Sequence, residues 1–292
     1  MRLQEQTFKK VYIEISNICN LQCTFCPVVD RDKKVMSVDF LRQTLRQVKP
    51  HAERVCYHVM GEPLNHPHFA EAVEVAEQEG VAIEITTNGT LLTEQLQKVL
   101  LSPAIAQVNF SLQSFVDNFP KSDPKTYFAK ILQFCALAEE QRPDLYINFR
   151  FWNLQPNETH NEINEFFLTT IEKIYAVDIN RRVDPAFNKS KKVKGRLYLH
   201  FDSRFEWPNK KGDILQTQGT CWGARSQLAI HANGQVVPCC LDKEADIPLG
   251  DLNTESFHQV LQGNAYLSVK EGFESNELRA DLCRRCSFRQ RF

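Results

Sequence analysis

Eight of the ten cysteines fall into two groups that lie far apart along this chain of 292 residues. The first group is Cys19, Cys23 and Cys26, and the second, in the last quarter of the chain, is Cys221, Cys239, Cys240, Cys283 and Cys286. The two cysteines between them lie in apolar surroundings and are predicted to be small buried side chains. The N-terminus has no apolar stretch of signal-peptide length, and no apolar run reaches the roughly 18 residues of a membrane span. We therefore expect a reducing, cytoplasmic compartment, no membrane association, and thiols that bind metal rather than form disulfides.

The charges of the chain are close to balanced. There are 35 Lys and Arg against 36 Asp and Glu, a formal net charge of −1, and 42% of the residues are hydrophobic. This composition is typical of a globular protein with an ample core and excludes a disordered chain. It also argues against nucleic-acid binding through bulk charge. The basic run at residues 188–196 is predicted to be a solvated loop, with a phosphate or RNA contact as the alternative.

Short β-branched and aromatic runs alternate with segments of helical period over the first 180 residues. The predicted strands are residues 11–16, 54–59, 81–87, 107–113, 145–151 and 173–179. Six βα units in succession predict a parallel sheet with right-handed crossovers, and six are too few to close an eight-stranded barrel. The predicted fold class is therefore α/β, an open partial (β/α)6 TIM-like barrel with its ligand site at the carboxyl ends of the strands.

The sequence changes in character after residue 182. Residues 227–240 are predicted to form a β-hairpin with Asn233-Gly234 in a type I′ turn, and a helix is expected from about Ser256. We predict a barrel core over residues 1–205 and a small C-terminal α+β domain over residues 206–292, which carries the second group of cysteines.

The first cysteines have the spacing C-x3-C-x2-C and directly follow the first predicted strand. Three thiolates in one tight loop can bind three corners of a [4Fe–4S] cube, whereas an electron-transfer cluster takes four. The remaining iron is then open to a substrate, as in catalytic metal sites that keep one position free. Zinc is the alternative, but zinc sites usually combine CxxC pairs with His, and no His lies within this loop.

This loop, in which Phe25 precedes the last cysteine, resembles the signature of the radical S-adenosylmethionine (radical SAM) superfamily. Gly61, Glu62 and Pro63 follow the second predicted strand and resemble the GGEP motif of that family, with Met60 in place of the first glycine. The resemblance implies that the acidic residue and backbone carbonyls of this motif receive the methionine ammonium. Carbonyl and carboxylate oxygens are the acceptors that an ammonium group needs.

Polar residues at the ends of the next predicted strands extend the resemblance: Thr87, Asn88, Ser111, Gln113 and Arg150. In the family, side chains at these positions hold the ribose and the carboxylate of S-adenosylmethionine, and a guanidinium suits the carboxylate. Taken singly, Ser111, Gln113 and Arg150 are equally explained by structural hydrogen bonds. As a set they favour a cofactor site.

The resemblance implies a [4Fe–4S] cluster and S-adenosylmethionine as cofactors of the first group. In this chemistry the methionine amino and carboxylate groups chelate the open iron, and an electron from an external flavodoxin- or ferredoxin-type reductant cleaves the sulfonium. The 5′-deoxyadenosyl radical that results abstracts a hydrogen atom from the substrate. The protein places the target carbon and excludes water and competing hydrogen donors.

The second group of cysteines resembles the opening of the SPASM extension of radical SAM enzymes, C-x9–15-G-x4-C, and ends in a CxxC pair. No further cysteine follows, so the group resembles the shortened twitch version, which holds one auxiliary cluster. The resemblance to twitch-type dehydrogenases implies four ligands: Cys221, Cys239, Cys283 and Cys286. Cys240 in place of Cys239, and a structural zinc site in place of the cluster, are the alternatives.

The expected function is the oxidation of a small molecule, with the auxiliary cluster accepting an electron from the substrate radical. Polar and aromatic residues at 200–209 are read as a linker and a candidate substrate wall. The alternatives are radical SAM modification of a peptide, protein or tRNA, and a non-enzymatic iron–sulfur electron carrier or redox sensor. A carrier needs four ligands per cluster, which the three-cysteine loop does not provide.

Overall fold

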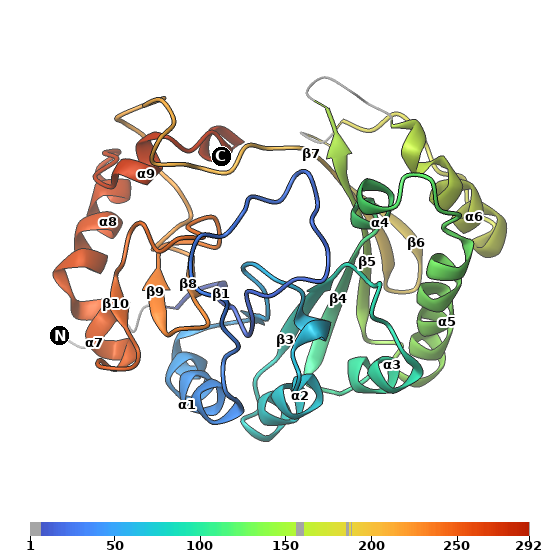
Figure 1. The fold of residues 1–292 in the computed structure, drawn as a ribbon, viewed down its shortest axis with the longest axis horizontal. Coiled ribbons are helices and arrows are strands. Elements are labelled where there is room, and N and C mark those ends of the chain that lie inside the picture. The colour runs from blue at the N-terminus through green and yellow to red at the C-terminus, as the bar shows by residue number, and fades with distance from the viewer. Residues whose placement is uncertain (1–6, 156–160, 185–186, 188, 292) are drawn as a thin grey trace. The chain divides into compact units, whose positions relative to one another are not determined.

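The structure, a computed structural model, describes residues 7–155, 161–184, 187 and 189–291 (Figure 1). The chain divides into two compact units. The first unit comprises Met1–Asn20, Pro27–Ile83 and Phe205–Phe292, and the second comprises Leu21–Cys26 and Glu84–Arg204. The chain thus passes from the first unit into the second and back within the cysteine loop.

The strands of the first unit have the order β10-β9-β8-β1-β2. Their bounds are β1 (Lys10–Ile13), β2 (Val55–Cys56), β8 (Gln227–Ile230), β9 (Gln235–Val237) and β10 (Gly250–Asp251). β1 pairs in parallel with β2 on one side and with β8 on the other, while β9 pairs antiparallel with β8 and β10. The cysteine-rich C-terminal segment therefore continues the same hydrogen-bonded ladder as the N-terminal strand.

The helices of the first unit are α1 (Val38–Val48), α2 (Phe69–Gln78), α7 (Phe257–Gln262), α8 (Asn264–Glu274) and α9 (Asp281–Arg284), followed by the 3-10 helix η4 (Phe288–Arg291). Ser37 caps α1, and Ser256, at the predicted start of a helix, caps α7 through its capping box. Phe8 is fully buried, and its ring contacts the rings of Phe257 and Tyr266 at 6.4 and 6.5 Å between centroids. The two ends of the sequence thus share one apolar core.

The second unit has the strand order β3-β4-β5-β7-β6. The strands are β3 (Ile83–Thr87), β4 (Ile105–Ser111), β5 (Tyr146–Leu154), β6 (Ser190–Lys194) and β7 (Leu197–Ser203); the helices are α3 (Glu94–Leu100), α4 (Gln113–Asn118), α5 (Lys125–Gln141) and α6 (Glu165–Tyr175). β4, β5 and β7 run parallel. Phe110, Phe128 and Phe149 are buried and in ring contact between sheet and helix, which leaves alternate side chains of β4 and β5 on the opposite face.

The prediction of a strand at residues 173–179 is wrong. The apolar residues Phe167, Leu168 and Ile171 are buried at helical spacing, and α6 continues to Tyr175 before Ala176 adopts a left-handed conformation with φ +50°. The last parallel strand is instead β7, in which Leu197, Leu199 and Phe201 alternate inward. The predicted number of strands in the βα series still agrees with the structure, because the prediction includes a strand at residues 173–179 that is absent and omits β7.

The predicted loop at residues 188–196 and linker at 200–209 are also wrong in part. Residue 188 lies outside the described residues, but Ser190–Lys194 form the edge strand β6, antiparallel to β7. Exposed lysines on an edge strand hinder pairing with another chain, which accounts for the basic run without an RNA partner. The residues 200–203 belong to β7 rather than to a linker.

The hairpin of β8 and β9 is confirmed, but its turn is not type I′. The turn is closed by a hydrogen bond of 2.9 Å from the Gly234 N–H to the His231 carbonyl, and Gly234 (φ +95°) has a positive φ whereas Asn233 does not. A type I′ turn needs positive φ at both central residues, whereas a type I turn followed by glycine needs it once.

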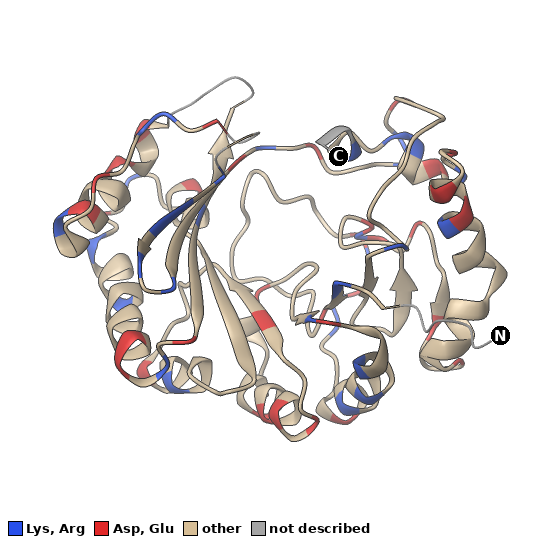
Figure 2. Ribbon diagram, turned by 180° about the vertical axis from the view of Figure 1, so that it is seen from behind, with Lys and Arg blue, Asp and Glu red and all other residues tan. Residues whose placement is uncertain are grey.

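Acidic and basic residues are both spread over the helices of each unit, as Figure 2 shows, in keeping with the near-zero net charge. Among the described residues, no helix is both long and apolar enough to cross a membrane.

Candidate active site and cysteine pocket

The loop that carries the first cysteines is closed at its base within the first unit. The Asn17 side chain donates to the Asp32 carbonyl at 2.9 Å and accepts from the Lys34 N–H at 2.7 Å. The backbone N–H of Asn17 also donates to the Lys34 carbonyl at 3.1 Å. Asparagine suits this position because one amide group supplies a donor and an acceptor to two facing backbones.

The middle of the loop is held within the second unit by the end of α4. Asp117 accepts hydrogen bonds of 2.6 Å from both the N–H and the hydroxyl of Thr24. Asn118 accepts from the Gln22 N–H at 2.9 Å, and its Nδ2 donates to Cys23 Sγ at 3.1 Å. Because the Gln22 bond fixes which end of the amide is oxygen, the Asn118 donor faces the sulfur.

These contacts oppose the effect of burial on Cys23. Burial raises the pKa of the Cys23 thiol, and hydrogen bonds from Ser114 and Asn118 lower it again. Hydrogen bonds to sulfur stabilise the thiolate, which is the form that binds metal. Cys19 and Cys26 are exposed, so neither side chain is used for packing.

Asp117 also connects the loop to the end of β7. The Arg204 guanidinium lies 3.6 Å from Asp117 and 5.9 Å from the centre of the Phe25 ring, within the range of a cation–π contact. Phe25, which the sequence assigns to the cofactor site, therefore lies against a cation that Asp117 positions.

For the S-adenosylmethionine cleavage that the sequence resemblance implies, we expect Asp117→Asn to slow the rate about 10- to 100-fold. An amide offers one acceptor where Thr24 uses two, and misplacing a reacting group by an ångström costs rates of that order. The rate is measured as 5′-deoxyadenosine formed by the reduced protein. Asp123→Asn is the matched control, since Asp123 is exposed and pairs with Lys125. Equal rates in the two variants would show that Asp117 does not position the loop.

The motif Gly61-Glu62-Pro63 lies in the first unit, tied to the residues that precede Cys19. The Glu62 N–H donates to the Ile18 carbonyl at 3.1 Å. Gly61 has φ +79°, and a Cβ there would overlap the Ser16 carbonyl oxygen, so glycine alone fits. The Glu62 side chain is 2% exposed and accepts from the Leu64 N–H at 3.1 Å, which caps the 3-10 helix η2 (Pro63–Asn65).

Thr87 and Asn88 lie at the end of β3 in the second unit, where both side chains hold their own loop. Thr87 Oγ1 accepts from the Gly89 N–H at 2.9 Å, and Asn88 Oδ1 accepts from the N–H and hydroxyl of Thr90 at 2.9 and 2.6 Å. The Tyr127 hydroxyl donates to the Asn88 carbonyl at 2.8 Å. The residues thus shape the strand end.

Ser111 and Arg150 are register partners on β4 and β5, on the face of the sheet opposite the phenylalanine core. The Arg150 guanidinium stacks 4.6 Å from the Trp152 ring, whose Nε1 donates to His200 Nδ1 at 2.8 Å. The prediction that Gln113 lies on a strand is wrong, because β4 ends at Ser111 and Gln113 begins α4. Its Oε1 is buried and has no hydrogen-bond partner among the described residues.

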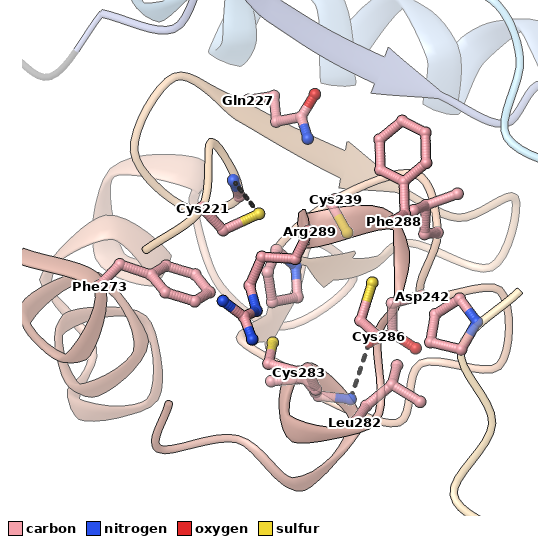
Figure 3. Close-up of a pocket in the computed structure, with 15 residues that line it drawn as sticks. Cys221, Gln227, Cys239, Asp242, Phe273, Leu282, Cys283, Cys286, Phe288 and Arg289 are labelled. Atoms are coloured by element: carbon pink, nitrogen blue, oxygen red, sulfur yellow. Dashed lines mark hydrogen bonds between the residues drawn. The ribbon is translucent and has the colours of Figure 1, made fainter. Parts of the chain in front are cut away.

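Four cysteines of the second group line one pocket of the first unit (Figure 3): Cys221, Cys239, Cys283 and Cys286. Burial raises the pKa of each of these thiols. Backbone N–H groups oppose this effect: that of Gly223 at Cys221, of Leu241 at Cys239, and of Phe288 and Arg289 at Cys286. Backbone donors aimed at sulfur are typical of thiolates that bind a cluster.

Cys240 does not line this pocket. It packs against the cluster of Val59, Met60, Ala229 and Val237, and the Tyr12 side chain hydrogen-bonds to its thiol. The pocket that the other four cysteines line encloses a cavity of about 30 Å³. Among the described residues, no three Cys, His, Asp or Glu are placed to hold a single metal ion.

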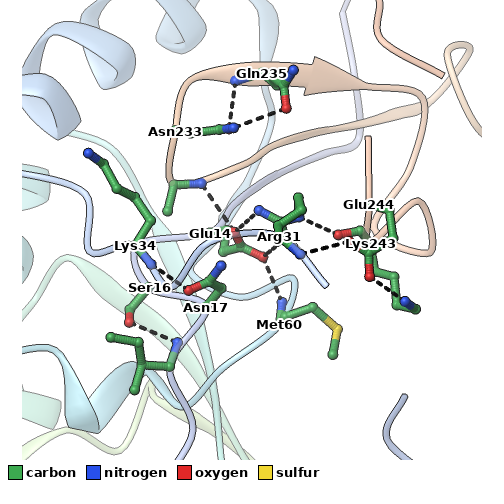
Figure 4. Close-up of polar contacts among 12 residues, drawn as sticks. Glu14, Ser16, Asn17, Arg31, Lys34, Met60, Asn233, Gln235, Lys243 and Glu244 are labelled. Atoms are coloured by element: carbon green, nitrogen blue, oxygen red, sulfur yellow. Dashed lines mark hydrogen bonds and ion pairs between the residues drawn. The ribbon is translucent and has the colours of Figure 1, made fainter. Parts of the chain in front are cut away.

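A buried glutamate in the first unit connects three segments (Figure 4). Glu14 is fully buried and pairs with Arg31 through two hydrogen bonds of 3.0 and 2.9 Å. It also accepts from the Met60 and Ala232 N–H groups, each at 3.2 Å. Glu14 therefore joins the segment after the cysteine loop, the GEP segment and the β8–β9 turn.

Sequence reasoning missed Glu14, Arg31, Asp117 and Asn118. For Glu14 a signal existed, because an acidic residue inside the apolar run VYIEIS requires a buried partner. For Asp117 and Asn118 none existed, since their partners lie more than 90 residues away in sequence. Cys56 and Cys135 are buried, as predicted.

Comparison with known families gives two matches. The radical SAM superfamily model matches residues 13–169, which is more than half of the chain, and the SPASM model, an iron–sulfur cluster-binding domain, matches residues 221–287. Among curated relatives, a tungsten-containing aldehyde ferredoxin oxidoreductase cofactor-modifying protein of Pyrococcus furiosus is 32% identical over 108 residues. The matched segment is 36% of this chain and only 30% of that protein. A GTP 3′,8-cyclase of Chlorobaculum tepidum is 23% identical over 93% of this chain and 91% of its own.

Solved structures show the same fold. BtrN in complex with AdoMet and 2-DOIA aligns over 97% of this chain and 94% of its own with a TM-score of 0.57 and 13% identity. Streptococcus suis SuiB bound to precursor peptide SuiA aligns over 91% of this chain and 67% of its own, with a TM-score of 0.61 and 16% identity. The predicted α/β partial barrel with a small C-terminal domain is thereby confirmed. The chain belongs to the radical SAM superfamily, whose domain implies S-adenosylmethionine and a [4Fe–4S] cluster, and it carries a SPASM-type domain for auxiliary iron–sulfur binding.

Proposed function

We propose that Cys19, Cys23 and Cys26 bind the [4Fe–4S] cluster that cleaves S-adenosylmethionine. The observation that carries this proposal is the support of the loop: Asp117 fixes Thr24 by two short hydrogen bonds, and Asn118 aims an N–H at Cys23 Sγ. The donor set of three thiolates fits the cluster, and the exposure of Cys19 and Cys26 leaves room for it. An electron carrier would need a fourth ligand.

The remaining residues of the predicted site divide by what their side chains already do. The Glu62 carboxylate already accepts the hydrogen bond from the Leu64 N–H that caps η2. We therefore propose the backbone of Gly61-Glu62-Pro63 as the part that binds the methionine ammonium. Thr87 and Asn88 position the third strand end. Ser111 and Arg150 lie on the face of the sheet opposite the phenylalanine core, where we propose that they contact the ribose and the carboxylate of S-adenosylmethionine. Gln113 adds a buried acceptor that has no partner among the described residues.

Bound at this loop, the cluster and S-adenosylmethionine supply a 5′-deoxyadenosyl radical when an external flavodoxin- or ferredoxin-type protein delivers an electron. The chain contributes orientation. Asp117 and Arg204 hold the loop with Phe25, and Glu14 fixes the Met60 N–H at the head of the motif. The free-thiol composition leads us to propose a cytoplasmic location.

The test is product detection. Anaerobically reconstituted, reduced protein is expected to convert S-adenosylmethionine to methionine and 5′-deoxyadenosine. The control is the triple variant Cys19→Ala, Cys23→Ala, Cys26→Ala, which is expected to give none. Absence of 5′-deoxyadenosine from fully iron-loaded protein after prolonged incubation would overturn the proposal.

We further propose that residues 206–292 form a domain in which Cys221, Cys239, Cys283 and Cys286 bind one auxiliary [4Fe–4S] cluster. The shared pocket and the backbone N–H donors support these four, and the packing of Cys240 away from the pocket favours Cys239 over Cys240. The match of residues 221–287 to an iron–sulfur cluster-binding domain favours the cluster over zinc.

For the reaction, we propose oxidation of a small hydroxylated molecule. The cluster held by Cys19, Cys23 and Cys26, with S-adenosylmethionine, would supply the group that removes a hydrogen atom from the substrate carbon. The auxiliary cluster held by Cys221, Cys239, Cys283 and Cys286 would accept the electron released when the hydroxyl-bearing carbon becomes a carbonyl and the hydroxyl proton is lost. The alignment with BtrN over nearly the whole chain supports this class. The alignment with SuiB bound to a peptide makes peptide modification the second candidate.

Deuterium transfer separates the two candidates. Perdeuterated polyols and aminocyclitols are expected to deliver deuterium into 5′-deoxyadenosine, with a carbonyl product of two fewer hydrogens. Transfer from deuterated peptides and none from the small molecules would replace our proposal with peptide modification.

A further inference from the structure

A buried arginine points into the cysteine pocket. Arg289 lies in η4, three residues after Cys286, and is 7% exposed. Its Nε and Nη2 have no hydrogen-bond partner among the described residues. Leaving charged donors buried and unpaired is costly, so a partner that completes this pocket is expected. The proposed auxiliary cluster supplies acceptor sulfurs there.

We propose that the Arg289 guanidinium donates to the sulfur atoms of the auxiliary cluster and, by its charge, raises the reduction potential of that cluster. This inference rests on the proposed function, because it requires that the second group of cysteines binds an iron–sulfur cluster. It assigns Arg289 as a positioning and tuning residue, since the iron ligands remain the four cysteines.

The chain makes room for this side chain at the residue pair before Cys221. Gly219 has φ +139°, and a Cβ at this position would overlap Arg289 Nη1. The Gly219 N–H donates to the Asn276 carbonyl at 3.0 Å, which fixes the segment. A glycine held in this conformation lets the guanidinium lie against the backbone that leads into the pocket.

Cys283 and Arg289 line the same pocket, and the charge of Arg289 acts on the Cys283 thiol. Burial and the neighbouring Cys221, Cys286 and Asp242 raise the pKa of this thiol, and Arg289 opposes them. In Figure 3 the guanidinium of Arg289 lies beside the Cys283 side chain. Arg289 therefore lies beside one of the four candidate sulfur ligands.

The charge of the cluster decides the direction of the effect. A [4Fe–4S] core of charge 2+ with four thiolates carries a net charge of −2, and reduction by one electron makes it −3. A buried positive charge stabilises the −3 state more than the −2 state, so it favours uptake of the electron. The buried carboxyl of Asp242 nearby opposes this, although burial also raises the pKa of that carboxyl to about 6.

The experiment is a potentiometric titration of both clusters in one reconstituted sample, followed by electron paramagnetic resonance. Arg289→Met is expected to shift the auxiliary cluster to lower potential by at least about 59 mV, which is a tenfold change in a one-electron equilibrium. Arg289→Lys, which keeps the charge, is expected to leave the potential of the auxiliary cluster close to that of the wild-type protein. Arg289→Gln, which keeps a donor without the charge, is expected to show most of the shift seen in Arg289→Met. The S-adenosylmethionine cluster in the same sample is the internal reference.

Arg285→Met is the matched control. Arg285 lies between the two cysteines of the CxxC pair, but its guanidinium is paired with Asp281 at 3.1 and 3.2 Å and does not line the pocket. An unchanged auxiliary potential in Arg289→Met with about eight irons bound would overturn the inference and leave the proposed function intact. Wild-type protein with four irons, or with zinc at the second site, would overturn the auxiliary cluster itself. Loss of auxiliary iron in Arg289→Met but not in Arg289→Lys would support the contact, since lysine keeps a positive charge and N–H donors that methionine lacks.

Discussion

A Glu14→Gln variant is expected to lose about 3–5 kcal/mol of unfolding free energy, the usual cost of breaking a buried ion pair on one side. Arg31 is 11% exposed and would keep its charge without its carboxylate. Glutamine also offers only one acceptor oxygen. Its amide NH2 would therefore face the N–H of Met60 or of Ala232, and that buried backbone donor would lose its acceptor. The loss is measured as the shift of the urea unfolding midpoint of the reconstituted protein.

The matched control for this variant is Glu74→Gln on α2, where the side chain is exposed and contacts Gln78. Its stability is expected to stay within about 0.5 kcal/mol of the parent. Because Glu14 also fixes the Met60 N–H, the affinity of the variant for S-adenosylmethionine is expected to fall with stability. A Glu14→Gln protein as stable as the Glu74→Gln control would show that the carboxylate contributes nothing as an ion-pair partner.

Cys283→Ala is expected to remove about half of the iron, from about eight atoms per chain to about four, because a cube that loses a ligand in this pocket loses its support. Slow cleavage of S-adenosylmethionine should persist, since the first loop is untouched. Iron and zinc are counted by inductively coupled plasma spectrometry, and cleavage by 5′-deoxyadenosine.

Cys240→Ala provides the control for this second variant, since Cys240 neighbours Cys239 in sequence but packs outside the pocket. It is expected to keep about eight irons. If Cys240→Ala instead lost the auxiliary iron while Cys239→Ala kept it, the ligand assignment would pass to Cys240. Zinc in the wild-type protein, lost in Cys283→Ala, would replace the auxiliary cluster by a structural zinc site.

Local patterns in the sequence predict the elements whose residues interact with near neighbours. The caps at Ser37 and Ser256, the β8–β9 hairpin and the run of βα units all follow from such patterns. The error at residues 173–179 has the same origin, because a short apolar run at a helix end fits either period. β7 was missed although Leu197, Leu199 and Phe201 alternate with polar residues, because residues 200–209 were interpreted as a linker.

The support of the site depends on contacts between distant residues, which no local pattern contains. Asn118 meets Cys23 across 95 positions, and Glu14 meets Ala232 across 218. The cysteine spacings predict the candidate ligands, four of which line one pocket in the structure. They gave no indication of Arg289, whose interest comes from burial and unpaired donors rather than from spacing.

The pairing of β8 with β1 has a consequence for how this chain can be divided. β1 is a central strand, with β2 on one side and β8 on the other, and it runs into the residues before Cys19. Removing the C-terminal segment would expose the N–H and C=O groups of Lys10–Ile13 along one full edge, together with the apolar surface of Phe8 that α7 and α8 cover. An uncovered strand of this kind templates association with other chains. The C-terminal segment therefore covers the edge of β1, the strand that leads into the cysteine loop, and protects this strand from association with other chains.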